Sequence, residues 1–242
     1  MREATKPGIG IDGCPAGWLL AALCSGLEPI GWEVSESLSY LLRSWPHSTY
    51  LVDMPVGLPD AKTTARECDA LARARLGKKS SSIFTPPTRA AIHCHTYSQA
   101  KDVNYNETGK KISKQAWNLR SKMLQADACA EHPAFHESHP ELAFQMLAGS
   151  ALSTNKKTKE GQIERSTVLR SYMPLVDSFC EDILQHTRRS AVKMDDILDA
   201  LVLSVTAALI SDRPEGMIGL PAVPPVDGSG RKMQMVFWQA QS

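Results

Sequence analysis

The stretch Gly8-Ile-Gly-Ile-Asp12-Gly13 decides the fold. In an extended chain its two isoleucines fall on one side, whereas the glycine between them and Asp12 fall on the other. A turn follows, and the runs 18–24 and 28–34 have the composition of two further strands. The pattern predicts an antiparallel meander of three strands whose first strand ends at a carboxylate.

A second carboxylate ends the run Tyr50-Leu-Val-Asp53, whose unbroken apolar character is typical of a strand buried on both faces. Residues 36–45 carry leucines at helical spacing and predict a crossover helix. A crossover allows the strand that ends at Asp53 to pair in parallel with the first strand. Asp12 and Asp53 would then lie at the carboxyl ends of neighbouring strands, where open α/β sheets bind ligands.

Two more aspartates stand near the start of the apolar stretch 193–210. Asp196 and Asp199 are three residues apart and therefore share one face of the predicted helix. Each of the four aspartates, taken alone, has a plain alternative as a cap or turn residue. Asp199 resists that alternative most, because it lies one turn inside a helix whose sequence requires burial nearly all round. The conjunction of the four favours one shared site.

Electrostatics specifies what such a site needs. Two carboxylates about 4 Å apart repel by about 4 kcal/mol at an effective dielectric constant near 20. Converging aspartates must therefore take up protons or bind cations, and hard oxygen ligands suit Mg²⁺ or Mn²⁺. Two such ions about 3.5–4 Å apart can assist hydrolysis of a phosphodiester. We therefore predict a magnesium- or manganese-dependent nuclease with Asp12, Asp53, Asp196 and Asp199 as metal ligands and nucleic acid as substrate.

The chain also resembles a known family over nearly its whole length. The motifs that carry the resemblance are Gly10-Ile-Asp-Gly-Cys-Pro-Ala-Gly-Trp18, Asp53-Met-Pro-Val-Gly-Leu-Pro59, Arg66-Glu-Cys-Asp69, His139-Pro-Glu141 and Lys156-Lys-Thr-Lys-Glu-Gly161 through Arg165. They resemble a bacterial and archaeal domain-of-unknown-function family that is described only as a predicted nuclease with a ribonuclease H fold. Asp196 to Leu201 also resembles, more distantly, the Asp-x-x-Asp-Ala-Leu pattern in the final helix of Holliday-junction resolvases.

The resemblance implies further site residues. Arg66, Lys156 and Arg165 would bind substrate, and Asp69 and Glu141 would support the metal ligands from behind. Each has a plain alternative. Glu141 is favourably placed near a helix start, Arg66 and Asp69 can form an intrahelical ion pair, and the lysine segment can be a solvated loop.

The domain organisation follows from length and pattern. At 242 residues and 43% hydrophobic, the chain favours one α/β domain over residues 1–242. The expected fold is ribonuclease H-like, with a mixed five-stranded sheet, flanking helices and a small C-terminal hairpin that includes 233–238. Residues 134–138 would supply the fifth strand. The region of about 60–130 exceeds one crossover helix and predicts a helical cap insertion with helices at 64–76 and 113–129.

Net charge, the lack of long apolar runs and the spacing of the cysteines limit which classes of protein this chain can belong to. A net charge of +1 excludes a strongly basic protein, so nucleic-acid contact would depend on local lysine and arginine clusters. No apolar run approaches the roughly 18 residues of a membrane span. The six cysteines show no close-paired spacing, as in reduced structural thiols. We expect a cytoplasmic protein without membrane contact, and oligomeric state has no signature in the sequence.

The glycine pattern at 8–13 fails as a dinucleotide fingerprint, because a second strand follows where a helix is required. A zinc site built from His132, His136 and His139 is disfavoured by the proline and strand pattern between them. Two rival functions stay open: an ATP-using enzyme of the same fold superfamily, and a catalytically inactive module that binds nucleic acid or protein. The substrate also stays open among RNA, DNA, hybrid, junction and nucleotide.

Overall fold

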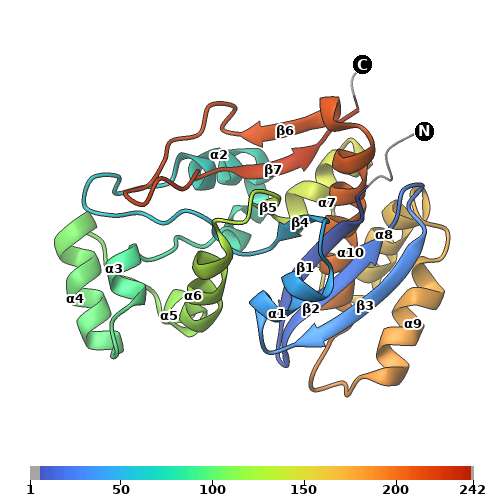
Figure 1. Ribbon diagram of the computed structural model, residues 1–242, viewed down its shortest axis with the longest axis horizontal. Helices are drawn as coiled ribbons and strands as arrows, with labels where there is room; N and C mark the ends of the chain where they lie inside the picture. The colour runs from blue at the N-terminus through green and yellow to red at the C-terminus, as the bar shows by residue number, and fades with distance from the viewer. Residues whose placement is uncertain (1–5, 241–242) are drawn as a thin grey trace. The chain divides into compact units, whose positions relative to one another are not determined.

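The computed structural model describes residues 6–240 and has an α/β fold built on a mixed sheet of seven strands (Figure 1). The strand order is β3-β2-β1-β4-β5-β7-β6. The strands are β1 (Gly8–Cys14), β2 (Gly17–Leu23), β3 (Pro29–Ser35), β4 (Thr49–Val52), β5 (Phe135–Glu137), β6 (Met217–Leu220) and β7 (Met235–Trp238). The predicted count of five strands is wrong, because β6 and β7 join the sheet beyond β5 and form no separate terminal hairpin. β7 falls within the predicted hairpin at 233–238, but a short apolar run does not show which strand it will pair with.

The predicted meander and crossover are confirmed. β1 pairs antiparallel with β2, and β2 with β3. Helix α1 (Leu38–Ser44) follows β3, and its three leucines are buried. β4 then pairs in parallel with β1 on the side away from β2, and β5 pairs in parallel with β4. Asp53 continues this ladder, since its amide donates to the carbonyl of Ile11 at 3.0 Å.

The glycine side of β1 explains how the longest helix packs. Helix α10 (Met194–Asp212) lies against β1 (Figure 1), and each of its residues from Ile197 to Ile210 is buried. A Cβ atom on Gly8 would lie 2.1 Å from the amide nitrogen of Ala208, and one on Gly10 would lie 2.0 Å from the carbonyl oxygen of Ala200. Only glycine permits this approach. The Ser204 hydroxyl also donates to the Gly8 carbonyl at 2.9 Å.

The chain divides into two compact units. The first contains residues 1–53, 134–218 and 236–242, of which 6–53 and 236–240 are described at its ends. Its remaining helices are α7 (Pro140–Ala148), α8 (Lys159–Arg170) and α9 (Val176–His186), with a short η2 (Pro214–Gly216) after α10. This unit holds β1 to β5 and the four predicted metal ligands, Asp12, Asp53, Asp196 and Asp199.

The second unit contains residues 54–133 and 219–235. Its helices are α2 (Glu67–Leu76), η1 (Gly77–Ser82), α3 (Arg89–Ile92), α4 (Tyr97–Thr108), α5 (Lys114–Asn118) and α6 (Arg120–Cys129). Gly77 ends α2 as predicted, whereas the single helix expected at 113–129 is broken at Leu119 into α5 and α6. Arg89 pairs with Asp127 and Asp227, and Arg231 pairs with Asp127, which ties residues 227–231 to the helices of this unit.

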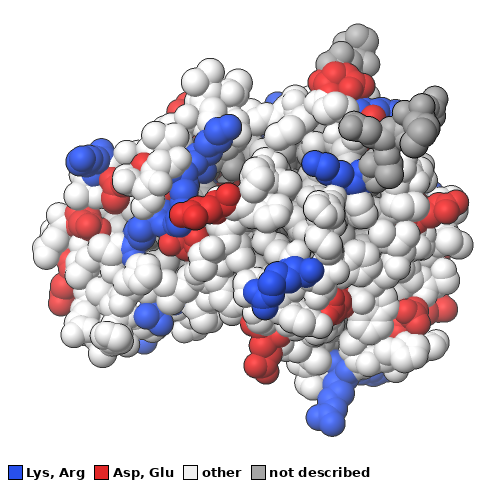
Figure 2. Space-filling view, in the orientation of Figure 1, with Lys and Arg blue, Asp and Glu red and all other residues white. Residues whose placement is uncertain are grey.

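Surface charge is mixed. On the face shown in Figure 2, basic and acidic side chains alternate among uncharged ones, in keeping with the net charge of +1. Within residues 6–240, no helix has both the length and the apolar character that crossing a membrane requires. All six cysteines are free thiols.

Candidate functional site

The packing of strand β1 against helix α10 brings Asp12 close to Asp199. Gly8, Gly10 and Asp12 share one side of β1 because side chains alternate along a strand. Gly8 lies against Ala208 and Gly10 against Ala200, so α10 runs toward its own N-terminus as β1 advances. One further step along this side of β1 brings Asp12 to the first turns of α10. There Asp199 repels Asp12 and raises its pKa. The periodicity of Gly8, Gly10 and Asp12 is thus what aims Asp12 at the helix.

Asp53 reaches the same place from the end of β4. A hydrogen bond joins the Asp53 and Asp12 side chains, and Asp53 also repels Asp199. Asp12 and Asp199 are buried, with Asp199 only 1% exposed, and Asp53 is partly buried. Three carboxyl groups that are distant in the chain therefore interact at the carboxyl end of two parallel strands.

Burial and mutual repulsion change how these groups ionise. Burial, followed by repulsion from Asp199 and Asp53, raises the pKa of Asp12 well above its usual range. Burial likewise raises the pKa of Asp53 to about 6 and that of Asp199 to about 6. A carboxyl group with a raised pKa donates a hydrogen bond to an ionised neighbour, which fits the bond between Asp12 and Asp53. Near neutral pH the cluster carries its full negative charge only with cationic compensation.

Lys156 supplies part of that compensation. Its ammonium nitrogen lies 2.5 Å from Asp199 Oδ2, and 35% of its side chain is exposed. Burial disfavours the ammonium form, but attraction to Asp199, Asp12 and Asp53 outweighs it and raises the pKa of Lys156. One lysine cannot neutralise three carboxylates. The other oxygen of Asp199, Oδ1, is buried without a hydrogen-bond partner, which costs on the order of 1–3 kcal/mol.

The segment that carries Lys156 is held from two sides. Glu164 of α8 accepts hydrogen bonds from the backbone amides of Ser153 at 2.8 Å and Thr154 at 3.0 Å, and from both of their hydroxyl groups. These bonds lower the pKa of Glu164 to about 2 despite an opposing effect of burial. Thr158 caps α8 by accepting from the amide of Gly161 at 3.1 Å. Lys156 therefore projects from a fixed turn.

Arg165 and Glu141 form a buried pair beneath this turn. Arg165 is 0% exposed, donates to the Gly161 carbonyl at 3.0 Å and ion-pairs with Glu141 in the first turn of α7. Glu141 in turn repels Asp53 and Asp199. The pair thus links α7 and α8 behind the aspartates, and Arg165 is in an interior position.

Asp196 lies at the margin of the cluster. Its Oδ2 accepts from the backbone amide of Lys193 at 2.9 Å, in the capping box that begins α10. Burial raises its pKa, and its charge adds to the repulsion on Asp12. Asp196 therefore combines its plain role as a helix cap with a contribution to the acidic site.

The remaining predicted residues, Arg66 and Asp69, belong to the second unit. Arg66 Nη1 lies 3.2 Å from Asp69 Oδ1, and both side chains are buried at the start of α2. This is the i,i+3 pair that their spacing allowed.

Sequence reasoning missed Glu164. The signal available was the pair of hydroxyl residues Ser153 and Thr154, which need an acceptor. Finding that acceptor required knowing that the turn folds back on α8, and spacing alone does not establish this.

Comparison with known proteins gives a family. The chain belongs to the family described as protein of unknown function (DUF429), whose sequence profile matches residues 10–225. The resemblance to an uncharacterised family is thereby confirmed. No solved structure matches the chain.

Proposed function

We propose that the protein is a nuclease dependent on a divalent cation, Mg²⁺ or Mn²⁺, with a ribonuclease H-like core. The observation that carries the proposal is the convergence of Asp12, Asp53 and Asp199, from β1, the end of β4 and α10, into one cluster with raised pKa values. The strand order β3-β2-β1-β4-β5, with a meander followed by two parallel strands, supports the fold assignment.

The donor set fits a hard cation. It consists of carboxylate oxygens, which Mg²⁺ and Mn²⁺ prefer, and Asp199 Oδ1 is buried with no other partner. Asp12, Asp53 and Asp199 would hold the ion, and Asp196 would add charge at the margin. When bound, the ion would supply positive charge against a phosphate oxygen and acidify water.

The chain's own residues would do the rest. Lys156 is partly exposed, so its ammonium group can turn from Asp199 to a phosphate oxygen once Asp199 has another cation. Lys156 would then orient the phosphate and offset its charge. Because burial raises the pKa values of Asp12 and Asp53, cation binding at these oxygens would be coupled to loss of protons. Arg165 and Glu141 would keep α7 and α8 in place behind the site.

One observation favours a second candidate. Lys156 already forms an ion pair with Asp199, so the cluster is partly neutralised by the chain itself. A module that binds nucleic acid or protein without cleaving it would need no further cation. The two candidates differ in their uptake of metal, which makes them separable.

The test combines metal binding with cleavage. Mn²⁺ uptake is measured by titration calorimetry, and cleavage is measured on single-stranded, hybrid and branched substrates with Mg²⁺ or Mn²⁺ and with EDTA. The variants are Asp12→Asn and Asp199→Asn. Asp177→Asn is the matched control, because Asp177 is an exposed aspartate of the same unit that pairs with Arg170 at 2.8 Å.

If the protein is a nuclease, Asp12→Asn and Asp199→Asn should abolish Mn²⁺ uptake and lower the cleavage rate at least about 100-fold, which corresponds to about 2.7 kcal/mol in the activation barrier. Circular dichroism should show that both variants are still folded. Asp177→Asn should behave as the unaltered protein. Cleavage that survives both substitutions would remove these residues from the reaction. If the unaltered protein takes up no Mn²⁺ and cleaves nothing, the binding module replaces the nuclease.

A further inference from the structure

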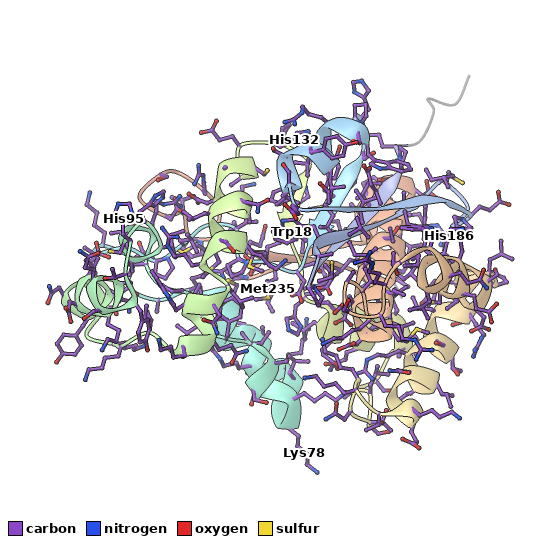
Figure 3. All side chains as sticks on the ribbon, turned by 90° about the horizontal axis from the view of Figure 1, so that it is seen from below. Trp18, Lys78, His95, His132, His186 and Met235 are labelled. Carbon is purple, nitrogen blue, oxygen red and sulfur yellow. The ribbon has the colours of Figure 1, made fainter. Side chains whose placement is uncertain are left out.

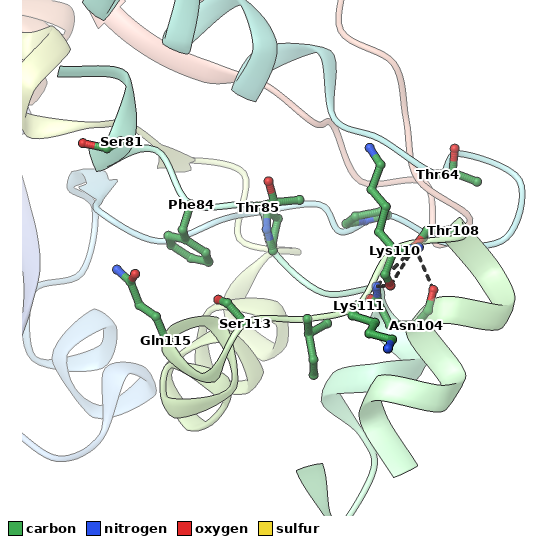
Figure 4. Close-up of a pocket in the computed structure, with 13 residues that line it drawn as sticks. Thr64, Ser81, Phe84, Thr85, Asn104, Thr108, Lys110, Lys111, Ser113 and Gln115 are labelled. Carbon is green, nitrogen blue, oxygen red and sulfur yellow. Dashed lines mark hydrogen bonds between the residues drawn. The ribbon is translucent and has the colours of Figure 1, made fainter. Parts of the chain in front are cut away.

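A hollow of about 340 Å³ lies within the second unit (Figure 4). It is formed by other residues than the clustered aspartates. Its walls come from three segments, 59–64, 81–86 and 104–115. Small-molecule sites commonly measure about 300–1,000 Å³, so this hollow is large enough for a ligand of modest size. No residue of the acidic site or of its supporting turn lines it.

The charge of the lining is of one sign. Lys110 and Lys111 line the hollow and no carboxylate does. Neither lysine forms an ion pair in the part of the chain that the structure describes. The surrounding segment 97–122 contains six basic residues and two acidic ones, an excess that the net charge of +1 conceals. A concave surface lined by one sign of charge concentrates the opposite ion.

The turn that carries the two lysines is fixed. The Asn104 side-chain amide donates to the Lys110 carbonyl at 2.7 Å and to the Thr108 hydroxyl at 3.2 Å, and its oxygen accepts from the Thr88 amide at 2.8 Å. Ile112 anchors the next residues in a small core with Ala91 and Ala100. The lysine stems therefore start from a preorganised backbone, which reduces the entropy lost when an anion binds.

The rest of the lining offers a ring and polar edges. Phe84 is partly exposed, and in Figure 4 Ser113 and Gln115 project from the opposite wall toward it. An aromatic face stacks on any nucleobase, and hydroxyl and amide groups can hydrogen-bond to its edges. Lys110 rises at the other end of the hollow, and Lys111 leaves the same turn in the opposite direction (Figure 4). A cationic end and an aromatic end match a ligand that joins a phosphate to a flat heterocycle.

We propose that this hollow binds one nucleotide unit, with its phosphate against Lys110 and its base against Phe84, while Lys111 adds positive charge from the same turn. The inference rests on the proposed nuclease function in one respect: that function is the reason for choosing a nucleotide over other phosphate esters as the ligand. The unit can be a free mononucleotide or part of a single strand, and binding measurements separate the two sources.

Binding is measured in EDTA, so that no metal chemistry contributes. Adenosine monophosphate and inorganic phosphate are titrated by calorimetry, and a labelled single-stranded oligonucleotide by fluorescence anisotropy over a range of salt concentrations. The variants are Phe84→Leu, which keeps apolar volume but removes the ring, and the pair Lys110→Ser with Lys111→Ser. Lys78→Ser is the matched control, since Lys78 is an exposed lysine of the same unit, projects outward in Figure 3 and does not line the hollow.

The unaltered protein should bind adenosine monophosphate more tightly than phosphate. Phe84→Leu should weaken mononucleotide binding about tenfold and leave phosphate binding unchanged, whereas the double lysine variant should weaken both and lower the salt slope for the strand by about 1. Strand binding with the same variant pattern, but without mononucleotide binding, identifies the strand as the source. Absence of both, or an equal loss in Lys78→Ser, overturns the proposal.

The outcome is independent of catalysis. Every residue that lines the hollow belongs to the second unit, so nucleotide binding there requires no residue of the acidic cluster. Nucleotide binding without any cleavage would overturn the proposed nuclease and leave this inference standing. Cleavage without nucleotide binding in the hollow would do the reverse.

Discussion

Lys156 Nζ lies 2.5 Å from Asp199 Oδ2, although 43 residues separate the two in the chain. This contact places an internal cation on one of three clustered carboxylates, two of which, Asp12 and Asp199, are buried. It partly offsets a repulsion that folding would otherwise have to overcome. The same position is where a bound cation or the phosphate of a substrate would compete, so the pair couples stability to binding.

Removing the Lys156 ammonium should therefore destabilise the metal-free protein. We expect Lys156→Gln to lower the free energy of unfolding in EDTA at neutral pH by about 1–2 kcal/mol, less than for a fully buried pair because the lysine is partly exposed. Saturating Mg²⁺ should reduce the deficit. Urea denaturation measures it, with Lys157→Gln as control because Lys157 is an exposed neighbour. Equal stability of the two variants would mean that the ion pair contributes nothing.

Gly10 should tolerate no side chain. A Cβ atom there would lie 2.0 Å from the Ala200 carbonyl oxygen and 2.3 Å from the Ser204 amide nitrogen, both backbone atoms that cannot rotate away. We expect Gly10→Ala to cost about 3 kcal/mol or more, since α10 would have to move off β1. Gly26→Ala is the comparison. It has open space but a φ of +84°, so it should cost only about 1 kcal/mol. Thermal and urea unfolding of both variants decide the matter.

The same glycine pattern shows which parts of the structure are predictable. Strand alternation and the buried run before Asp53 predicted β1 to β4 and the parallel pairing, because both are local consequences of which face is buried. The break of the 113–129 helix at Leu119 has no such signal, since no glycine or proline stands there. β6 and β7 were misjudged because partners distant in the chain decide whether short apolar runs join a sheet.

The aspartates show a similar limit at the level of the site. Asp12, Asp53 and Asp199 were predictable as a set because each ends or enters a buried element, where an unpaired charge is costly. Asp196 and Asp199 share a helix face, yet only Asp199 is fully enclosed, while Asp196 caps the helix. Helical spacing cannot distinguish these roles.

Stability in EDTA should fall as pH rises through the range in which the aspartates ionise. Burial raises the pKa values of Asp53 and Asp199 from 3.8 to about 6, so the native state binds more protons than the unfolded state between these values. Stability is then lost between about pH 4 and pH 6, by at most about 3 kcal/mol per carboxyl. Other carboxylates titrate as well, so the readout is the difference between the unaltered protein and Asp199→Asn at each pH. Asp199→Asn should become relatively more stable as pH rises, and a flat difference would contradict the raised pKa.

Metal uptake should show the complementary pH dependence. A cation requires ionised oxygens, and burial raises the pKa values of Asp12, Asp53 and Asp199. Mn²⁺ binding should therefore strengthen between pH 5 and about pH 7 and release protons. Calorimetry in two buffers of different ionisation enthalpy counts the protons released. Mn²⁺ uptake that is equally strong at pH 5 and pH 7, with no proton release, would mean that the ion binds outside the aspartate cluster.

We expect Glu164 to hold Lys156 in position without affecting metal binding by the aspartates. Its carboxylate fixes the Ser153 and Thr154 turn, and Glu164→Gln replaces a charged acceptor of several hydrogen bonds by a neutral amide. We expect a loss of about 1 kcal/mol in unfolding free energy. Mn²⁺ affinity should stay unchanged, because the proposed ligands are untouched, while KM for substrate rises several-fold as Lys156 loses its fixed position. Glu160→Gln is the matched control, since Glu160 is an exposed glutamate of the same helix. A fall in Mn²⁺ affinity equal to that of Asp199→Asn would show that Glu164 acts on the whole acidic cluster. An unchanged KM would show that substrate binding does not depend on the position of Lys156.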